Sequence, residues 1–207
     1  AVNRECRAVR NAVGVYDGSP LGKFELKGTN VGEFLDFIYT NVMSSLQPGC
    51  GRYGVMLTED GLIFDDGVAF RIDQYRWFIS TSSGHSDAVN QHMQKILTFD
   101  HPEWDVKITE ITNQWNNATI CGPLARNLLE KLGSNIDIGN NSFPFMSFRE
   151  GNVADIPSRI IRVSFTGELS FEINVAPRNV LALWEKIIEE GKEFGILPVG
   201  SEASHVL

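Results

Sequence analysis

Two apolar runs separated by a short turn restrict the fold of this chain more than any other feature of the sequence. The runs cover residues 53–58 and 62–72, and Glu59-Asp60-Gly61 stands between them. An Asp-Gly pair between two apolar runs is a strong signal for a β-hairpin. Residues 75–81 predict a third strand directly after the second run. The sequence therefore predicts an antiparallel sheet built around this hairpin.

Single helices interrupt the predicted strands along the chain. Thr29 or Asn30 can cap a helix whose apolar stripe begins at Val31, and Ser86 can cap another helix that contains Val89. The other predicted strands cover residues 23–27, 106–112, 117–121, 159–165 and 169–175, and the other predicted helices cover residues 5–15, 123–132 and 177–191. Because hairpins alternate with single helices and no regular βαβ rhythm occurs, we predict an α+β fold with mostly antiparallel sheets and flanking helices.

Length and charge limit the classes of function. A chain of 207 residues suits one large domain or two small ones, and 18 basic against 26 acidic residues give a net charge of −8. Nucleic-acid binding and adhesion to an acidic membrane both need basic patches, so neither partner is expected. Three scattered cysteines predict free thiols in a reducing compartment. Without a membrane-length apolar run or a signal peptide, the sequence predicts a cytoplasmic protein.

Three motifs are rejected because of their context. The run Gly49-Cys50-Gly51-Arg52-Tyr53-Gly54 fits the G-x-G-x-x-G pattern of dinucleotide-binding proteins, but a strand rather than a helix follows it, so it predicts a turn. The four histidines form no HExxH motif and no Cys or carboxylate completes a metal set, so no metal site is expected. The triplet Asn117-Ala118-Thr119 fits a glycosylation sequon, which means little without a secretory route.

Acidic residues occur at two places inside apolar strand patterns. Asp65 and Asp66 are neighbours in the second run, and because adjacent strand residues point to opposite faces, one carboxylate points inward if the other is exposed. Glu172 alternates with apolar residues in a run that should pack against the core. An inward carboxylate is costly unless it is hydrogen-bonded or functional. The alternatives are a turn or bulge at the aspartates and a structural salt bridge from Glu172 to Arg162.

Inward carboxylates and nearby aromatic residues together suit a flat, polar heteroaromatic ligand. A carboxylate can accept hydrogen bonds from a ring N–H and an adjacent exocyclic amine at once, as pterins and guanines present them. Residues 159–165 and 169–175 predict a second hairpin, and this interpretation expects the acids of the two hairpins to face one cavity. Composition and spacing do not name the ligand.

The chain resembles a known family, the folate-binding family of the glycine-cleavage T-protein (aminomethyltransferase). The resemblance covers essentially the whole chain and rests on residues 8–15, 19–23, 39–41, 52–54, 61–66, 122–123 and 165–168. Within the family, it resembles most the C-terminal half of the α subunit of heterotetrameric sarcosine oxidase. This finer resemblance rests on residues 57–67, 162–169 and 205–207.

The resemblance implies a T-protein-like folate-binding fold over residues 1–207, made of two interleaved α+β subdomains. It also implies that this sequence is a fragment of a longer chain and is truncated before the family's C-terminal β domain. In the implied tetrahydrofolate site, Asp66 matches the catalytic aspartate, Glu172 the pterin-binding glutamate and Tyr53 an aromatic position near the pterin. Asp66 would accept a hydrogen bond or a proton from a folate nitrogen while that nitrogen attacks a one-carbon electrophile.

An enzyme complex follows from the same resemblance. The chain would be the one-carbon-accepting domain of a sarcosine oxidase α subunit, which forms 5,10-methylenetetrahydrofolate as sarcosine is oxidatively demethylated. Its partners would be the other sarcosine oxidase subunits and a small-molecule folate. FAD, FMN and NAD would bind only elsewhere in the whole enzyme, and the isolated fragment would be inactive.

Three departures from the T-protein pattern argue against direct T-protein activity. Phe165, Cys121 and Ser204 stand where T-proteins have Tyr, Gln and Arg. The alternatives to the sarcosine oxidase interpretation are a glycine-cleavage aminomethyltransferase and a non-catalytic folate-binding or assembly module.

Overall fold

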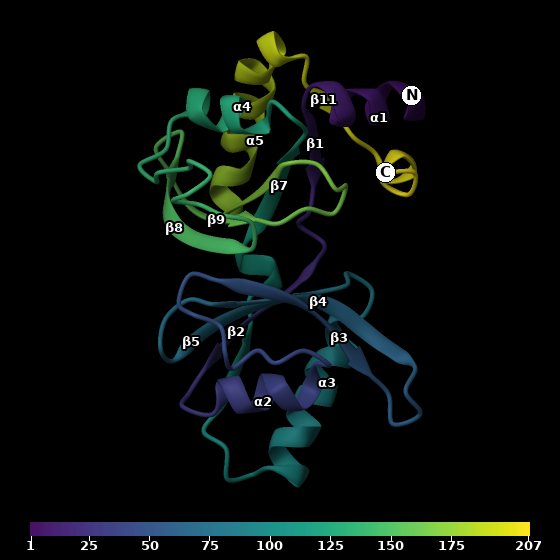
Figure 1. Cartoon of the computed structure of the whole chain (residues 1–207), viewed down its shortest axis with the longest axis vertical. Coiled ribbons are helices and arrows are strands. Elements are labelled where there is room, and N and C mark those ends of the chain that lie inside the picture. Colours follow the sequence, from purple (N-terminus) through teal and green to yellow (C-terminus); the bar gives the residue numbers. More distant parts are fainter. The chain divides into compact units, whose positions relative to one another are not determined.

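The computed structural model describes residues 1–207 and divides them into two compact units. The central unit comprises residues 20–112, and the split unit comprises residues 1–19 together with residues 113–207. The chain therefore starts in the split unit, builds the whole central unit and then returns to complete the split unit (Figure 1). Each unit has its own sheet and its own apolar core.

A five-stranded antiparallel sheet forms the frame of the central unit. Its strands, in spatial order, are β3 (Gly51–Leu57), β4 (Ile63–Arg71), β5 (Arg76–Thr81), β2 (Gly22–Lys27) and β6 (Lys107–Glu110). Helices α2 (Val31–Ile38) and α3 (Ser86–Lys95) lie on one face of this sheet in Figure 1. A short π-helix, η1 (Ile96–Asp100), continues α3, and a 3₁₀ turn, η2 (Thr112–Gln114), follows β6.

The predicted hairpin is confirmed as the pair β3–β4, in which Tyr53 lies opposite Val68 and Val55 lies opposite Asp66. Apolar residues from the helix-covered face of the sheet pack against α2 and α3 to form the core of the central unit. This core includes Phe24, Leu26, Phe34, Leu35, Met56, Ala69, Trp77, Ile79, Val89 and Met93. The hairpin therefore buries one face under the helices, and Tyr53 and Asp66 lie on the other face.

The predicted helix caps are wrong in detail. Asn30 directly precedes α2 and Ser86 is the first residue of α3, but neither helix start has a side-chain capping hydrogen bond. The Asn30 amide donates instead to Glu33 at 2.7 Å, and the Ser86 hydroxyl points to Glu110 at 3.5 Å. The amide oxygen of Asn30, the atom that would cap α2, instead accepts the backbone N–H of Asp105 at 3.1 Å.

A six-stranded sheet forms the frame of the split unit. Its strands, in spatial order, are β11 (Leu197–Pro198), β1 (Gly14–Asp17), β7 (Asn116–Cys121), β10 (Ser170–Val175), β9 (Ile156–Arg162) and β8 (Ser147–Val153). Only the pair β1–β11 is parallel. The helices are α1 (Val2–Asn11), α4 (Ala125–Leu132), α5 (Pro177–Gly191) and α6 (Ser201–Ser204), with a 3₁₀ turn, η3 (Lys192–Phe194), after α5.

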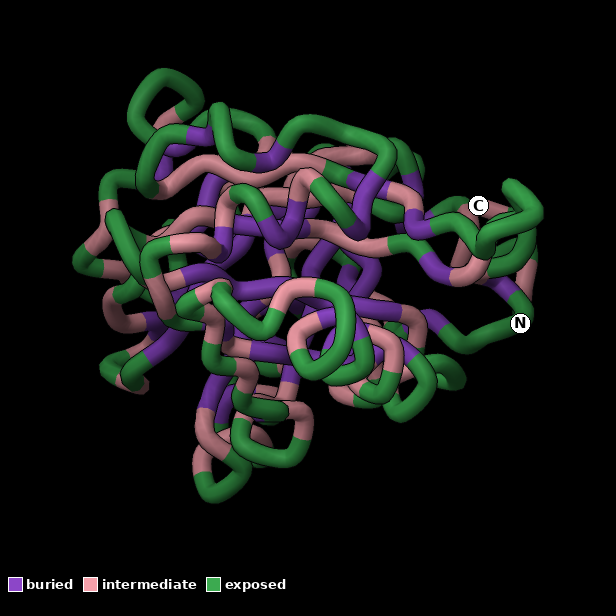
Figure 2. Tube along the Cα trace, turned by 90° about the horizontal axis from the view of Figure 1, so that it is seen from below, coloured by how far each residue is buried: buried purple, intermediate pink, exposed green.

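Helices α4 and α5 lie beside each other against one face of this sheet (Figure 1). The core that they cover includes Val15, Ala118, Ile120, Leu128, Phe171, Ile173, Leu183 and Ile187. Figure 2 follows burial along the chain, with exposed residues concentrated in the connections. The predicted fold class, α+β with mostly antiparallel sheets and flanking helices, is confirmed. No helix has both the length and the apolar character needed to cross a membrane.

The sequence does not predict the strands β1 and β8. The helix expected over residues 5–15 ends at Asn11, because Gly14 starts β1 and packs so close to the helix that a Cβ there would lie 2.6 Å from a methyl group of Val9. Strand β8 turns into β9 through Ala154 and Asp155, whose φ angles of 50° and 62° are left-handed. Ala rarely adopts that conformation, so the segment carries no turn signal in the sequence.

Phe171 anchors the core of the split unit next to Glu172. Its side chain is fully buried, its ring centroid lies 5.9 Å from that of Phe143, and the Arg126 guanidinium lies over the ring at 5.3 Å. We expect Phe171→Ala to lower the free energy of unfolding by about 3–5 kcal/mol in urea denaturation, because it removes apolar burial and leaves a cavity. The control Leu181→Ala, at an exposed position, should change it by less than about 0.5 kcal/mol. Equal losses in the two variants would contradict this expectation.

Candidate functional site

Strand β4 presents its two neighbouring acids on opposite faces of the sheet. Asp65 is 3% exposed, whereas Asp66 is exposed. The prediction that one carboxylate is exposed while the other points inward is therefore confirmed. The inward carboxylate is that of Asp65, whereas the residue that the resemblance matches to a catalytic aspartate is the exposed Asp66. The two carboxylates differ in their surroundings.

The carboxylate of Asp65 is held inside the central unit by the segment that follows β5. It accepts the backbone N–H of Ser82 at 3.3 Å and lies 3.6 Å from Nδ1 of His85. Burial, followed by the charges of Asp65 and Asp66, raises the pKa of the nearby Tyr39 hydroxyl. A carboxylate that is enclosed by core residues and a backbone N–H suits a structural role better than contact with a ligand.

Tyr53 and Asp66 come together on the face of the β3–β4 hairpin that the helices leave uncovered. The Tyr53 hydroxyl donates a hydrogen bond to Oδ2 of Asp66 at 3.0 Å, and Tyr53 is 50% exposed. The pairing is diagonal across the two strands, because Tyr53 lies directly opposite Val68. Two of the three predicted site residues therefore meet in the central unit. They offer an accessible aromatic ring beside a carboxylate that can accept a proton.

The pKa of the Tyr53 hydroxyl is raised above its usual value of 10.0, first by partial burial and then by the hydrogen bond to Asp66 and that residue's charge. The neutral phenol is the donor, so the stability that this bond contributes is present below about pH 10 and is lost as the pH rises through the folded-state pKa. We expect Asp66→Asn to lower the pKa of Tyr53 towards its usual value, because only the effects of burial and of the Asp65 charge remain. Carbon-13 NMR of labelled tyrosine, assigned with Tyr53→Phe, measures this change. An unchanged pKa in Asp66→Asn would contradict the hydrogen bond.

Glu172 lies near the middle of the split unit's sheet, on the face opposite to the one that α4 and α5 cover. It pairs with Thr119 on β7, and Thr119 in turn pairs with Tyr16 on β1. Oε2 of Glu172 accepts a hydrogen bond from Nδ2 of Asn117 at 3.1 Å. Burial, and then the charge of Glu172, raise the pKa of Tyr16. Three adjacent strands therefore build a polar face around this carboxylate.

The sequence does not single out two further residues of this polar face, Asn117 and Thr119, as site residues. The Thr119 hydroxyl donates to Oδ1 of Asn117 at 2.7 Å, and both residues are only 1% exposed. The one sequence signal on them is the glycosylation sequon, which a buried and hydrogen-bonded amide does not support. Their alternation with the apolar Ala118 and Ile120 is the pattern that marks them as one face of a strand.

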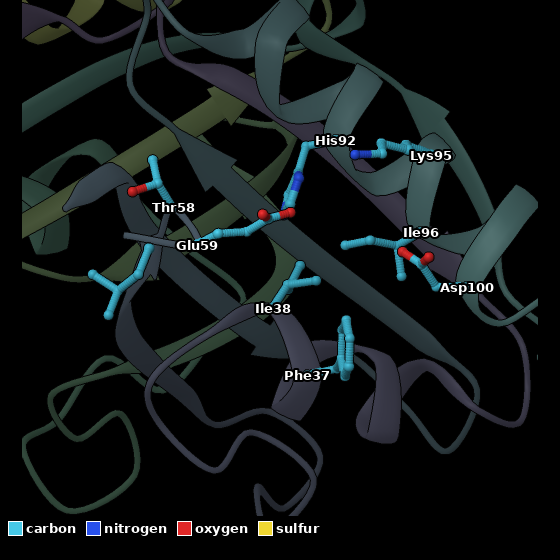
Figure 3. Close-up of a pocket in the computed structure, with 9 residues that line it drawn as sticks. Phe37, Ile38, Thr58, Glu59, His92, Lys95, Ile96 and Asp100 are labelled. Atoms are coloured by element: carbon cyan, nitrogen blue, oxygen red, sulfur yellow. The ribbon is translucent and has the colours of Figure 1, made fainter. Parts of the chain in front are cut away.

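Two hollows lie within single units. One of about 240 Å³ in the central unit is lined by Phe37, Ile38, Leu57, Thr58, Glu59, His92, Lys95, Ile96 and Asp100, and Glu59 extends towards His92 in it (Figure 3). Burial and the charge of Lys95 lower the pKa of His92. Another of about 330 Å³ in the split unit is lined by Leu132, Gly133, Ser134, Asn135, Asn152 and Asp155. Neither hollow is lined by Tyr53, Asp66 or Glu172.

Residues 1–207 match the family model described as the GCVT N-terminal domain. The chain belongs to this family. Its fold agrees with this assignment. The aminomethyltransferase T of the glycine cleavage system from Bartonella henselae superposes with a TM-score of 0.84 at 24% identity, over 99% of this chain and 52% of that chain. The expected T-protein-like fold is therefore confirmed.

The relatives of this chain include oxidoreductase subunits and transferases. The sarcosine oxidase subunit alpha of Corynebacterium sp. (strain U-96) is 43% identical over 100% of this chain and 22% of its own length. The aminomethyltransferase of Chloroherpeton thalassium is 32% identical over 98% of this chain and 54% of its own length. A chain of heterotetrameric sarcosine oxidase from Corynebacterium sp. U-96 shares the fold, with a TM-score of 0.65 at 14% identity over 96% of this chain and 95% of that chain. This chain thus spans about a fifth of the length of the first relative and about half of the second.

Proposed function

We propose that this chain is the tetrahydrofolate-binding, one-carbon-accepting domain of a sarcosine-oxidase-type α subunit. The observation that carries the proposal is the 43% identity to a sarcosine oxidase α subunit over the whole of this chain. The 32% identity to an aminomethyltransferase supports the same one-carbon chemistry. Other subunits are the proposed protein partners, and the oxidation of an N-methyl amine, with its flavin and nicotinamide cofactors, is assigned to other parts of the complex.

The side chains of Tyr53, Asp66 and Glu172 fit a reduced folate. The edge of a pterin ring that carries a ring N–H and an exocyclic amine is a hydrogen-bond donor, so it needs an acceptor. Glu172 is such an acceptor, and it is already held by the Asn117 amide. Tyr53 offers an exposed aromatic ring, and Asp66 offers an exposed carboxylate beside it. The donor and acceptor types of these residues therefore agree with those of the ligand.

Tyr53, Asp66 and Glu172 each have a separate proposed role. When bound, tetrahydrofolate supplies a nucleophilic nitrogen that takes up the one-carbon unit. Tyr53 orients Asp66 by donating to its Oδ2 atom. The negative charge of Asp66 favours a cationic one-carbon group nearby, and Asp66 then acts as a general base that takes up the proton released by the attacking folate nitrogen. Glu172 binds the pterin edge, and a charge-assisted hydrogen bond gives this contact more strength than a neutral group would.

The one-carbon product of the complete protein tests this proposal. During turnover of sarcosine with tetrahydrofolate present, 5,10-methylenetetrahydrofolate is expected in place of free formaldehyde. Formation of formaldehyde alone at saturating folate would contradict the one-carbon-accepting role. Absence of sarcosine turnover, with transfer from an aminomethylated carrier protein instead, would replace the proposal with an aminomethyltransferase.

A further inference from the structure

We infer that Thr119 and Asn117 form a hydrogen-bond relay that positions Glu172 and sets which ligands the split unit accepts. The relay is continuous, because Thr119 Oγ1 donates to Asn117 Oδ1 at 2.7 Å and Asn117 Nδ2 donates to Glu172 Oε2 at 3.1 Å. The inference rests on the proposed function, since it takes Glu172 as the folate contact. Thr119 and Asn117 are positioning residues in this scheme and do not take part in the chemistry.

The direction of the relay follows from the chemistry of its three side chains. A carboxylate has no proton to donate, so Asn117 must turn its NH₂ group towards Glu172. The amide oxygen then faces Thr119, and the hydroxyl must donate to it. The hydroxyl and the carboxylate favour the same amide orientation, so without the hydroxyl one of the two hydrogen bonds that fix Asn117 is lost. Thr119 therefore orients Asn117, and Asn117 orients Glu172.

The backbone around Asn117 keeps the relay in place. The backbone N–H of Asn117 donates to the Ser19 hydroxyl at 2.9 Å, and its carbonyl accepts the N–H of Gly18 at 3.0 Å. A Cβ at Gly18 would lie 2.9 Å from both Cγ and Oδ1 of Asn117, so the bare glycine packs directly on the amide. Asn117 and Thr119 are each 1% exposed, which limits competition from water. These backbone hydrogen bonds and the close packing of Gly18 limit the positions that the amide can take.

The ionised Glu172 carboxylate can only accept hydrogen bonds, and the relay holds its Oε2 atom in place. A ligand group that faces it must therefore donate, and a group that only accepts would be repelled. The 2-amino group and ring N–H of a reduced pterin donate together. An analogue without the 2-amino group offers one donor fewer, so the relay should favour the amino compound.

A matched pair of variants at Thr119 tests the relay in the complete protein. Thr119→Val keeps the shape and removes the hydroxyl, whereas Thr119→Ser keeps the hydroxyl. We expect Thr119→Val to raise the Kd for tetrahydrofolate about three- to tenfold, and Thr119→Ser to stay within about twofold of the wild type. The kcat at saturating folate should stay within about twofold in both variants. The preference for tetrahydrofolate over its 2-desamino analogue should fall only in Thr119→Val.

Three outcomes would overturn the relay. Equal Kd values for Thr119→Val and Thr119→Ser would show that the hydroxyl is irrelevant, whether both bind normally or both bind weakly. An unchanged Kd in Glu172→Gln would overturn the proposed folate contact and the relay with it, whereas a weakened Glu172→Gln beside a normal Thr119→Val would overturn the relay alone. If Thr119→Val does not fold, Gly18→Ala replaces it, because its Cβ would press on the amide and should raise the Kd in the same way.

Discussion

Replacing Asp66 with Asn is expected to slow one-carbon transfer strongly in the complete protein while tetrahydrofolate still binds. Asn has nearly the same shape as Asp but cannot take up a proton or stabilise a cationic group, so the loss falls on the reaction. A positioned general base contributes about 10²–10⁴-fold to the rate, and we expect a loss of that size in the formation of 5,10-methylenetetrahydrofolate. The rate of that formation at saturating folate and the Kd from calorimetry together separate reaction from binding.

The neighbouring acid provides the control for this experiment. Asp65 is buried and bonded to the Ser82 backbone, so Asp65→Asn should affect stability and leave transfer largely intact in the protein that folds. Unchanged transfer in Asp66→Asn would remove Asp66 from the chemistry and favour a folate-binding module without a reaction of its own. Loss of transfer in Asp65→Asn alone would assign the role to the buried acid.

Glu172→Gln is expected to weaken tetrahydrofolate binding. The variant keeps the size of the side chain but loses the charge that strengthens its hydrogen bonds to N–H donors. Hydrogen bonds to charged groups contribute about 1.5–3 kcal/mol, so we expect the Kd to rise about 10- to 150-fold. Calorimetric titration of tetrahydrofolate into the complete protein measures the change.

An exposed glutamate of the same unit serves as the matched control for Glu172. Glu185→Gln on α5 makes the same chemical change on an exposed helix position and should leave the Kd unchanged. Equal affinities of the wild type and Glu172→Gln would take Glu172 out of the site. A similar loss in Glu185→Gln would indicate a general charge effect instead of a specific contact.

Periodicity predicted those elements that bury a single face. The β3–β4 hairpin and α5 have regular apolar spacing that local sequence reveals, and both are present. Periodicity did not predict the elements whose conformation depends on packing between distant segments. Gly14 begins a strand because β1 pairs with β7, and Ala154 adopts a left-handed conformation in the turn between β8 and β9. No local pattern records either of these constraints.

The candidate site was predictable only in part for a related reason. Alternation predicted one exposed and one inward aspartate, but not which, because that depends on the side of the sheet that the helices cover. Met56, which pairs with Asp65, lies in the core under α2 and α3, and this places Asp65 on the buried face. The contact of Asn117 with Glu172 joins residues 55 positions apart on neighbouring strands, and sequence spacing alone does not pair those strands.

A crystal structure of the complete protein with a bound reduced folate would test the central claim most directly. We predict that the pterin edge lies within hydrogen-bond distance of the Glu172 carboxylate, about 2.7–3.2 Å, with Asn117 still donating to Oε2. We also predict that the folate nitrogen that takes up the one-carbon unit lies within reach of Asp66. A folate bound elsewhere, with Glu172 and Asp66 both remote from it, would contradict the proposed site.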